Sequence, residues 1–123
     1  MNRQEVVAFI KTEFGVEEEH LWMNFSDYIV FRNPKNKKWF AIIMKIEKKK
    51  LGLEGEGQVN IIDLQCDPIL IGSLLLGEGY LPAYHMNKAS WITVLLDGSA
   101  NENELKDLIR LSYEIIEKKA KKR

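Results

Sequence analysis

The chain has 123 residues, 46% of them hydrophobic and 29% charged, and its 18 basic residues balance its 18 acidic ones. This composition predicts one globular domain over residues 1–123 and excludes disorder for most of the chain, because a chain of this length buries about two-thirds of its surface on folding. We expect a cytoplasmic protein with no membrane partner, since no apolar run approaches the roughly 18 residues of a membrane span and no secretory signal opens the sequence.

Hydropathy patterning predicts alternating helices and strands. Apolar residues three or four apart, bounded by caps and glycines, indicate helices, and short runs of β-branched and aromatic residues indicate strands. In chain order the predicted elements are a helix at 2–13, a hairpin of strands at 28–31 and 39–44, a flexible glycine-rich connection at 48–57, a strand at 59–66, a short helix at 69–76, an ordered loop at 79–88, a strand at 91–95, and a helix from 101 that ends in a basic tail at about 118–123.

Capping signals support the two long helices and, with the element order, the fold class. Asn2 with Glu5 and Asn101 with Glu104 have the spacing of a capping box, and Gly15 follows the first helix. Strands grouped between helices are typical of a two-layer α+β domain. We therefore predict an antiparallel sheet with helices on one face.

Basic residues gather in two parts of the chain. Thirteen of the 18 lie within positions 32–50 and 118–123. If these segments converge in the fold, they form one positive surface that suits the phosphates of nucleic acid. A solvated hairpin tip and a frayed chain end would explain the same residues without a ligand. The candidate phosphate contacts are Lys35, Lys37, Lys38, Lys48, Lys49, Lys50 and Lys88.

Residues 81–94 carry the most distinctive motif, in which Leu-Pro-Ala-Tyr-His-Met-Asn-Lys is followed, after Ala-Ser, by Trp-Ile-Thr-Val. This run resembles the signature of the MmcQ/YjbR family. Further matches to that family occur in the same order, at 24–27, 38–41, 64–68 and 111–113. The resemblance covers nearly the whole chain.

The resemblance implies a fold and a class of ligand. The family has a CyaY-like α+β fold, with a sheet similar to that of secretion chaperones, and its members are described as DNA-binding proteins. This chain has Gln65 where many relatives have lysine, and Ala89-Ser90 where arginine and histidine are common. No helix with base-reading arginines is visible, so we expect weak, salt-sensitive and largely sequence-independent contacts to the phosphate backbone.

The motif loop supports two hypotheses. Its polar side chains either fix an irregular loop by hydrogen bonds or recognise a small ligand such as a phosphate or nucleotide. A catalytic role for His85 would need Cys66 or another partner beside it, and neither His20 nor Cys66 stands at metal-ligand spacing from it. We therefore expect a non-enzymatic protein without metal or cofactor. The motif-loop residues are Pro82, Tyr84, His85, Asn87, Lys88 and Trp91.

Two further features keep other functions open. The apolar face of such a sheet could receive a protein partner, which would make the domain an interaction module instead of a DNA-binding protein. Trp22, Trp39 and Trp91 could stack on unpaired bases, although the β-branched neighbours of Trp39 and Trp91 favour core packing.

Overall fold

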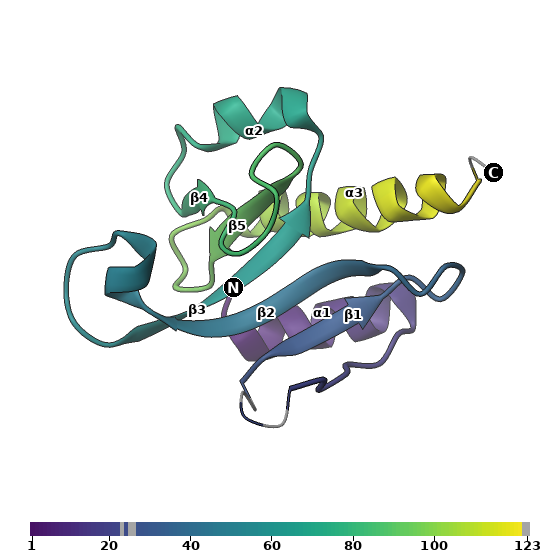
Figure 1. The fold of residues 1–123 in the computed structure, drawn as a ribbon, viewed down its shortest axis with the longest axis horizontal. Helices are drawn as coiled ribbons and strands as arrows, with labels where there is room; N and C mark the ends of the chain where they lie inside the picture. Colours follow the sequence, from purple (N-terminus) through teal and green to yellow (C-terminus); the bar gives the residue numbers. More distant parts are fainter. Residues whose placement is uncertain (23, 25–26, 122–123) are drawn as a thin grey trace.

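The structure is a computed structural model that describes residues 1–22, 24 and 27–121 (Figure 1). Two residues of the 24–27 match and the last two of the predicted tail therefore lie outside the described residues. The elements are α1 (Arg3–Phe14), β1 (Ile29–Arg32), β2 (Trp39–Glu47), the 3₁₀ helix η1 (Lys48–Leu51), β3 (Gln58–Gln65), α2 (Pro68–Leu74), β4 (Tyr80–Pro82), β5 (Trp91–Leu95) and α3 (Glu102–Lys121).

The predicted fold class is confirmed. The five strands form one antiparallel sheet in the order β1-β2-β3-β5-β4. Both halves of the capping box that Asn2 and Glu5 predict are present in α1, and Gly15 ends that helix in the left-handed conformation. Asn101 likewise accepts a hydrogen bond from the Glu104 N–H at the start of α3.

Three segments differ from the prediction. The predicted loop at 79–88 contains β4, a three-residue strand at the edge of the sheet that pairs with β5. The connection at 48–57 begins with η1, which closes at Gly52 with a φ of 73°. The final helix continues to Lys121, so its lysines up to that residue belong to α3 and not to a frayed tail.

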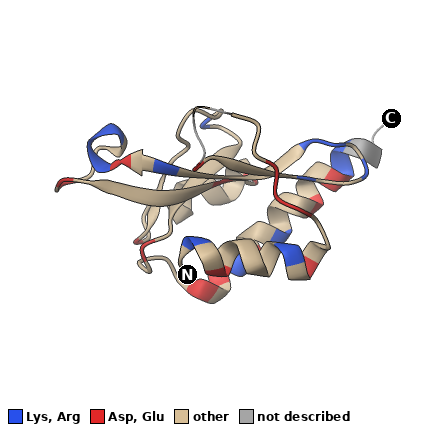
Figure 2. Ribbon diagram, turned by 90° about the horizontal axis from the view of Figure 1, so that it is seen from below, with Lys and Arg blue, Asp and Glu red and all other residues tan. Residues whose placement is uncertain are grey.

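Helices α1 and α3 cover one face of the sheet, as Figure 2 shows. Val6 and Ile10 of α1 and Ile109 of α3 are fully buried against Ile43 of β2 and Ile62 of β3. These residues recur at the period of a helix or on one side of a strand, so the hydropathy pattern directs both layers to a common core.

Loops cover the opposite face of the sheet. Val30, Ile42, Met44 and Ile61 are buried on this side. The side chains that pack over them come from the segment before β1, from η1 and its following turn, and from the motif loop; they include Trp22, Tyr28, Leu51, Leu53, Tyr84 and Met86. Because both faces are covered, the central strands read as nearly continuous apolar runs.

Ser112 joins α3 to the sheet where the β2–β3 ladder stops. The last paired residues at this end are Ala41 and Leu64. Beyond them, the fully buried Ser112 hydroxyl accepts a hydrogen bond from the Gln65 N–H at 3.0 Å and donates one to the Phe40 carbonyl. A hydroxyl thus stands between two strands that no longer pair directly, and the end of the sheet is held open.

Replacing Ser112 by alanine should lower the free energy of unfolding by about 1–3 kcal/mol, because a buried N–H and a buried carbonyl then lose their partner. The Ser73→Ala variant removes a hydroxyl that bonds the Leu70 carbonyl on the exposed face of α2, and should stay within about 0.5 kcal/mol of the wild type. Urea unfolding of both variants checks this. Equal losses would show that the Ser112 bridge contributes nothing of its own.

Candidate functional site

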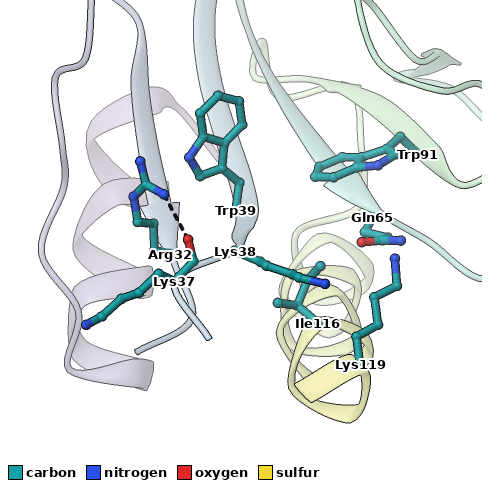
Figure 3. A pocket seen from close by; sticks show the side chains of 8 residues that line it. All are labelled: Arg32, Lys37, Lys38, Trp39, Gln65, Trp91, Ile116 and Lys119. Atoms are coloured by element: carbon teal, nitrogen blue, oxygen red, sulfur yellow. Dashed lines mark hydrogen bonds between the residues drawn. The ribbon is translucent and has the colours of Figure 1, made fainter. Parts of the chain in front are cut away.

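A positively charged cleft lies at the end of the sheet that Ser112 holds open. Its volume is about 430 Å³. The floor is formed by Gln65, Trp39, Trp91 and Ile116, which come from β3, β2, β5 and α3. The rim carries Arg32, Lys37, Lys38 and Lys119 (Figure 3).

The β1–β2 turn is attached to α3, and this attachment brings the two basic segments together. The Asn36 side chain donates to the Ile116 carbonyl at 2.9 Å, and the Lys35 ammonium pairs with Glu117, which raises the pKa of Lys35. Lys37 adopts a positive φ of 62°, which closes the turn. Hairpin and helix, far apart in sequence, therefore share one cleft.

The cations of the cleft differ in how far they are neutralised. Arg32 pairs with Glu19 at 3.0 Å, donates to the Lys37 carbonyl at 2.8 Å and lies 5.7 Å from the centre of the Trp39 ring. Lys38 and Lys119 extend towards Gln65, whereas the Lys37 side chain points away from it (Figure 3). Neither Lys38 nor Lys119 forms an ion pair with any described acidic residue, so these two lysines carry the uncompensated charge.

The prediction of a single cationic surface is therefore wrong for Lys48, Lys49 and Lys50. Lys48, Lys49 and Lys50 belong to η1, at the opposite end of the molecule's long axis from the cleft (Figure 1 and Figure 2). Lys49 and Lys50 also lie 3.4 and 3.9 Å from Glu47. The basic run at 32–50 is split because the extended strand β2 separates its two ends.

Three motif-loop residues hold the loop in place. The Asn87 side chain accepts from the Ala89 N–H at 2.9 Å, and its carbonyl accepts from the Trp91 N–H at 2.9 Å. The Lys88 ammonium donates to the Ala83 carbonyl at 3.0 Å. Pro82 ends the edge strand β4, where its missing N–H disturbs no inner ladder. Lys88 is thus engaged within the loop and lies outside the residues that line the cleft.

A second hollow, the aromatic pocket, opens on the loop-covered face and has a volume of about 230 Å³. The Trp22 ring lies edge-on to the rings of Tyr28 and Trp39, with centroid distances of 5.8 and 5.7 Å. Tyr84 and His85 of the motif loop, whose ring centroids lie 4.0 Å apart, form the other wall. Trp39 lines both this pocket and the cleft.

Asp63 is the one acidic group in the lining of the aromatic pocket. Its side chain is fully buried; Oδ1 accepts a hydrogen bond from the Thr93 hydroxyl, and Oδ2 has no hydrogen-bond partner among the described residues. Burial raises the pKa of Asp63 to about 7, although the Thr93 hydrogen bond and the charge of Lys88 oppose the shift. The carboxyl is therefore an unsatisfied hydrogen-bonding group at the base of an apolar hollow.

Several residues of both hollows were not among the predicted site residues. Arg32 and Lys119 line the cleft, and nothing in the local sequence shows that the hairpin and α3 meet. Asp63 does carry a signal, because Val59, Ile61 and Asp63 alternate along β3 and share one face of the sheet. An acid at the third position of a buried apolar series is the kind of exception that marks a site.

Neither a metal-holding cluster nor a membrane-spanning helix occurs within the described ranges. No group of three His, Cys, Asp or Glu side chains there is placed to hold a metal ion. None of the helices in that part of the chain combines the length and the hydropathy of a membrane span. The His85 ring lies beside the Tyr84 ring and lines the aromatic pocket, and the lining of that pocket contains no cysteine.

Comparison with known proteins gives a family and a sequence relative. The model of the YjbR family matches residues 13–115. The uncharacterised Bacillus subtilis protein YyaQ is 34% identical over 115 residues, which cover 94% of this chain and 98% of that protein.

Solved structures of similar proteins have the same fold. A crystal structure of a Pseudomonas syringae protein that is 42% identical superposes with a TM-score of 0.92 and covers 94% of this chain and 99% of its own. A solution NMR structure of a Pseudomonas syringae protein, also 42% identical, superposes with a TM-score of 0.85 and covers 94% of this chain and 93% of its own. A Deinococcus radiodurans protein that is 21% identical gives 0.70 over 96% of this chain and 80% of its own, which supports the fold alone.

Proposed function

This chain belongs to the YjbR family, and from that premise we propose that it is a non-enzymatic protein that binds the phosphate backbone of nucleic acid in the cationic cleft. The observation that carries the proposal is the placement of Lys38 and Lys119. They come from distant parts of the chain, border one cleft beside Trp39 and Trp91, and have no acidic partner among the described residues. Two unpaired ammonium groups beside the half-buried Trp39 indole suit a phosphate next to a base.

The small number of available cations in the cleft supports weak binding with little sequence preference. Lys38 and Lys119 are free to neutralise phosphates, and Arg32 can share its charge between Glu19 and a ligand. With about two or three phosphates neutralised, the logarithm of Kd should rise with the logarithm of salt concentration with a slope of about 2. Phosphate contacts fix position without reading sequence, so related strands should bind with similar affinity.

The alternative of a protein-interaction module on the sheet face has less support. The apolar side chains of the face opposite the helices are buried under the chain's own loops. Among the described residues, the exposed large apolar side chains lie instead on α2 and near it, or before β1; they are Leu21, Ile69, Leu70 and Leu76. The described residues therefore offer less apolar surface on this face than such a module would use.

The proposal is tested by fluorescence anisotropy of a labelled single-stranded oligonucleotide, and of its duplex, at low and moderate salt. The Lys38→Ala/Lys119→Ala variant should bind the strand about tenfold or more weakly than the wild type, since about 1.4 kcal/mol of lost interaction is tenfold in Kd. The Lys49→Ala/Lys50→Ala variant, with the same change in net charge at η1, should bind like the wild type.

A variant that adds a positive charge to the cleft should bind the oligonucleotide more tightly than the wild type. Gln65 lies between Lys38 and Lys119 on the floor of the cleft, so Gln65→Lys should tighten binding and steepen its salt dependence. Absence of binding at low salt would contradict the proposal. Equal losses in the two double variants would show diffuse attraction by net charge instead of binding in the cleft.

A further inference from the structure

The aromatic pocket has the size and walls for one planar ring. Its volume of about 230 Å³ lies below the roughly 300–1,000 Å³ of pockets that enclose a whole drug-sized ligand. The rings of Trp22, Trp39 and Tyr84 offer flat apolar surface, and the sulfur-containing side chains of Met44 and Met86 complete the lining. Such a pocket suits part of a larger ligand whose remainder lies outside it.

Asp63 determines which hydrogen-bonding group the bound ring carries on its edge. Because Thr93 already donates to Oδ1, the open hydrogen-bonding position is Oδ2, which is buried without a partner among the described residues. An N–H group on the ring edge would satisfy it. A purely hydrocarbon ring would leave this oxygen desolvated and unpaired, which costs about 1–3 kcal/mol.

The neighbouring cleft defines the rest of the ligand. Trp39 forms a wall of both hollows, and Asp63 and Gln65 are successive residues on the same face of β3. Two residues along a strand span about 7 Å, the scale of one nucleoside. A ligand that fills both sites therefore has an N–H-bearing ring at one end and an anionic group at the other.

An organic cation is disfavoured, although aromatic rings with a carboxylate are typical of sites for quaternary ammonium groups. The Lys88 charge acts on Asp63, and Arg32, Lys38 and Lys119 border the adjoining cleft. With its pKa raised to about 7, Asp63 also carries only part of a negative charge near neutral pH. A neutral ring is not repelled by these cations, and an N–H hydrogen bond to Oδ2 favours the ionised carboxylate of Asp63.

We propose that the aromatic pocket receives one unpaired nucleobase, which donates an N–H hydrogen bond to Asp63 while its phosphate lies beside Lys38 and Lys119. This inference rests on the nucleic-acid function proposed above and specifies its ligand as single-stranded. A duplex conceals the Watson–Crick donors of its bases and cannot place a base in the aromatic pocket without extruding it.

Three probes separate the inference from the function on which it rests. They are a short single-stranded oligonucleotide, an abasic strand of the same length with intact sugars and phosphates, and a free nucleoside monophosphate. The oligonucleotide should bind about tenfold or more tightly than the abasic strand, in line with the stacking of one base on aromatic side chains. The indole N–H signal of Trp22 in NMR spectra should shift with the oligonucleotide and not with the abasic strand, whereas the signal of Trp39, which lines both hollows, should shift with both.

Asp63→Asn is the decisive variant. The Thr93 hydroxyl keeps the side-chain oxygen of asparagine, so the NH₂ group replaces Oδ2 and meets the base with donor against donor. The oligonucleotide should lose most of its tenfold advantage while affinity for the abasic strand is unchanged. Asp97→Asn, which removes the same charge beyond the far end of β5, should change neither affinity. Trp22→Leu gives a second test at the pocket wall and should likewise reduce the affinity advantage of the oligonucleotide over the abasic strand.

Each outcome is decisive. Equal binding of the oligonucleotide and the abasic strand would overturn the base pocket and leave phosphate binding in the cleft intact. Absence of binding by both strands would overturn the nucleic-acid function itself. Binding of the nucleoside monophosphate as tightly as the strand, with the same loss in Asp63→Asn, would support the base pocket and assign it to a free nucleotide.

Discussion

The Asp63→Asn variant should be more stable than the wild-type protein above pH 7 and less stable near pH 4. Burial raises the pKa of Asp63 to about 7 from its ordinary value of 3.8, so the folded protein binds this proton more tightly than the unfolded chain. Its contribution to the free energy of unfolding is therefore fully present below about pH 4 and is lost as the pH rises to about 7. A difference of about 3 pKa units corresponds to about 4 kcal/mol over this window.

Asparagine removes this pH dependence, and it lowers the free energy of unfolding by a smaller amount that does not vary with pH. Its NH₂ group takes the place of Oδ2, where no described residue accepts a hydrogen bond, and costs about 1–3 kcal/mol. The net gain of the variant above pH 7 should thus be about 1–3 kcal/mol. Urea unfolding of both proteins at several pH values between 4 and 8 gives the difference directly.

Other ionisable groups near Asp63 are common to both proteins and cancel in that difference. They are Lys88, whose charge acts on Asp63, and Tyr28, Tyr84 and His85, which line the pocket. A stability difference that does not change with pH would show that Asp63 is not the titrating group. A gain in stability together with a loss of oligonucleotide affinity would distinguish a binding residue from a structural one.

Replacing Gly79 by alanine should reduce the free energy of unfolding by about 3 kcal/mol or more. Gly79 has a φ of +93°, and an added Cβ would lie 2.7 Å from the Ala100 nitrogen and 2.8 Å from the Ser99 Oγ. The left-handed conformation costs a side chain about 1–2 kcal/mol, and overpacking against backbone costs about 1–3 kcal/mol more. The Gly79 carbonyl also accepts a hydrogen bond from the Leu95 N–H at 2.8 Å, so a shift would disturb the end of β5.

Gly98→Ala is the matched control for this close approach. Gly98 has a similar φ of +88° but no atom within 4 Å of the added Cβ, so only the conformational cost of about 1–2 kcal/mol applies. Urea unfolding of the two variants isolates the contribution of the contact with Ala100. Equal losses would mean that the segment after β5 adjusts freely to the added methyl group.

Local interactions made much of the fold predictable from the sequence. The capping box at Asn2 and the N-cap hydrogen bond at Asn101 involve residues three positions apart, so they are visible without any tertiary structure. Strand β4 was missed because three residues that end in Pro82 have no period of their own and depend on pairing with β5. The resemblance to the YjbR family, read from the motif at 81–94, is confirmed by the family match.

The candidate site was less predictable because it depends on contacts between distant parts of the chain. Lysine content alone could not separate Lys38, which lies in the cleft, from Lys49, which lies beyond the other end of β2. Tyr84 and His85 were recognised as candidate ligand residues and line the aromatic pocket. Asp63 could have been found, since the alternation along β3 predicts that it points among apolar residues.

The attachment of the hairpin turn to α3 also bears on when the site can form. The hydrogen bond from Asn36 to Ile116 joins positions 80 residues apart. Closing so long a loop carries an entropic cost that only late, non-local contacts repay. During synthesis, Lys38 leaves the ribosome long before Lys119, so a nascent chain has no cleft until α3 has emerged and docked. Competence to bind phosphate should therefore be among the last properties that the folding chain acquires.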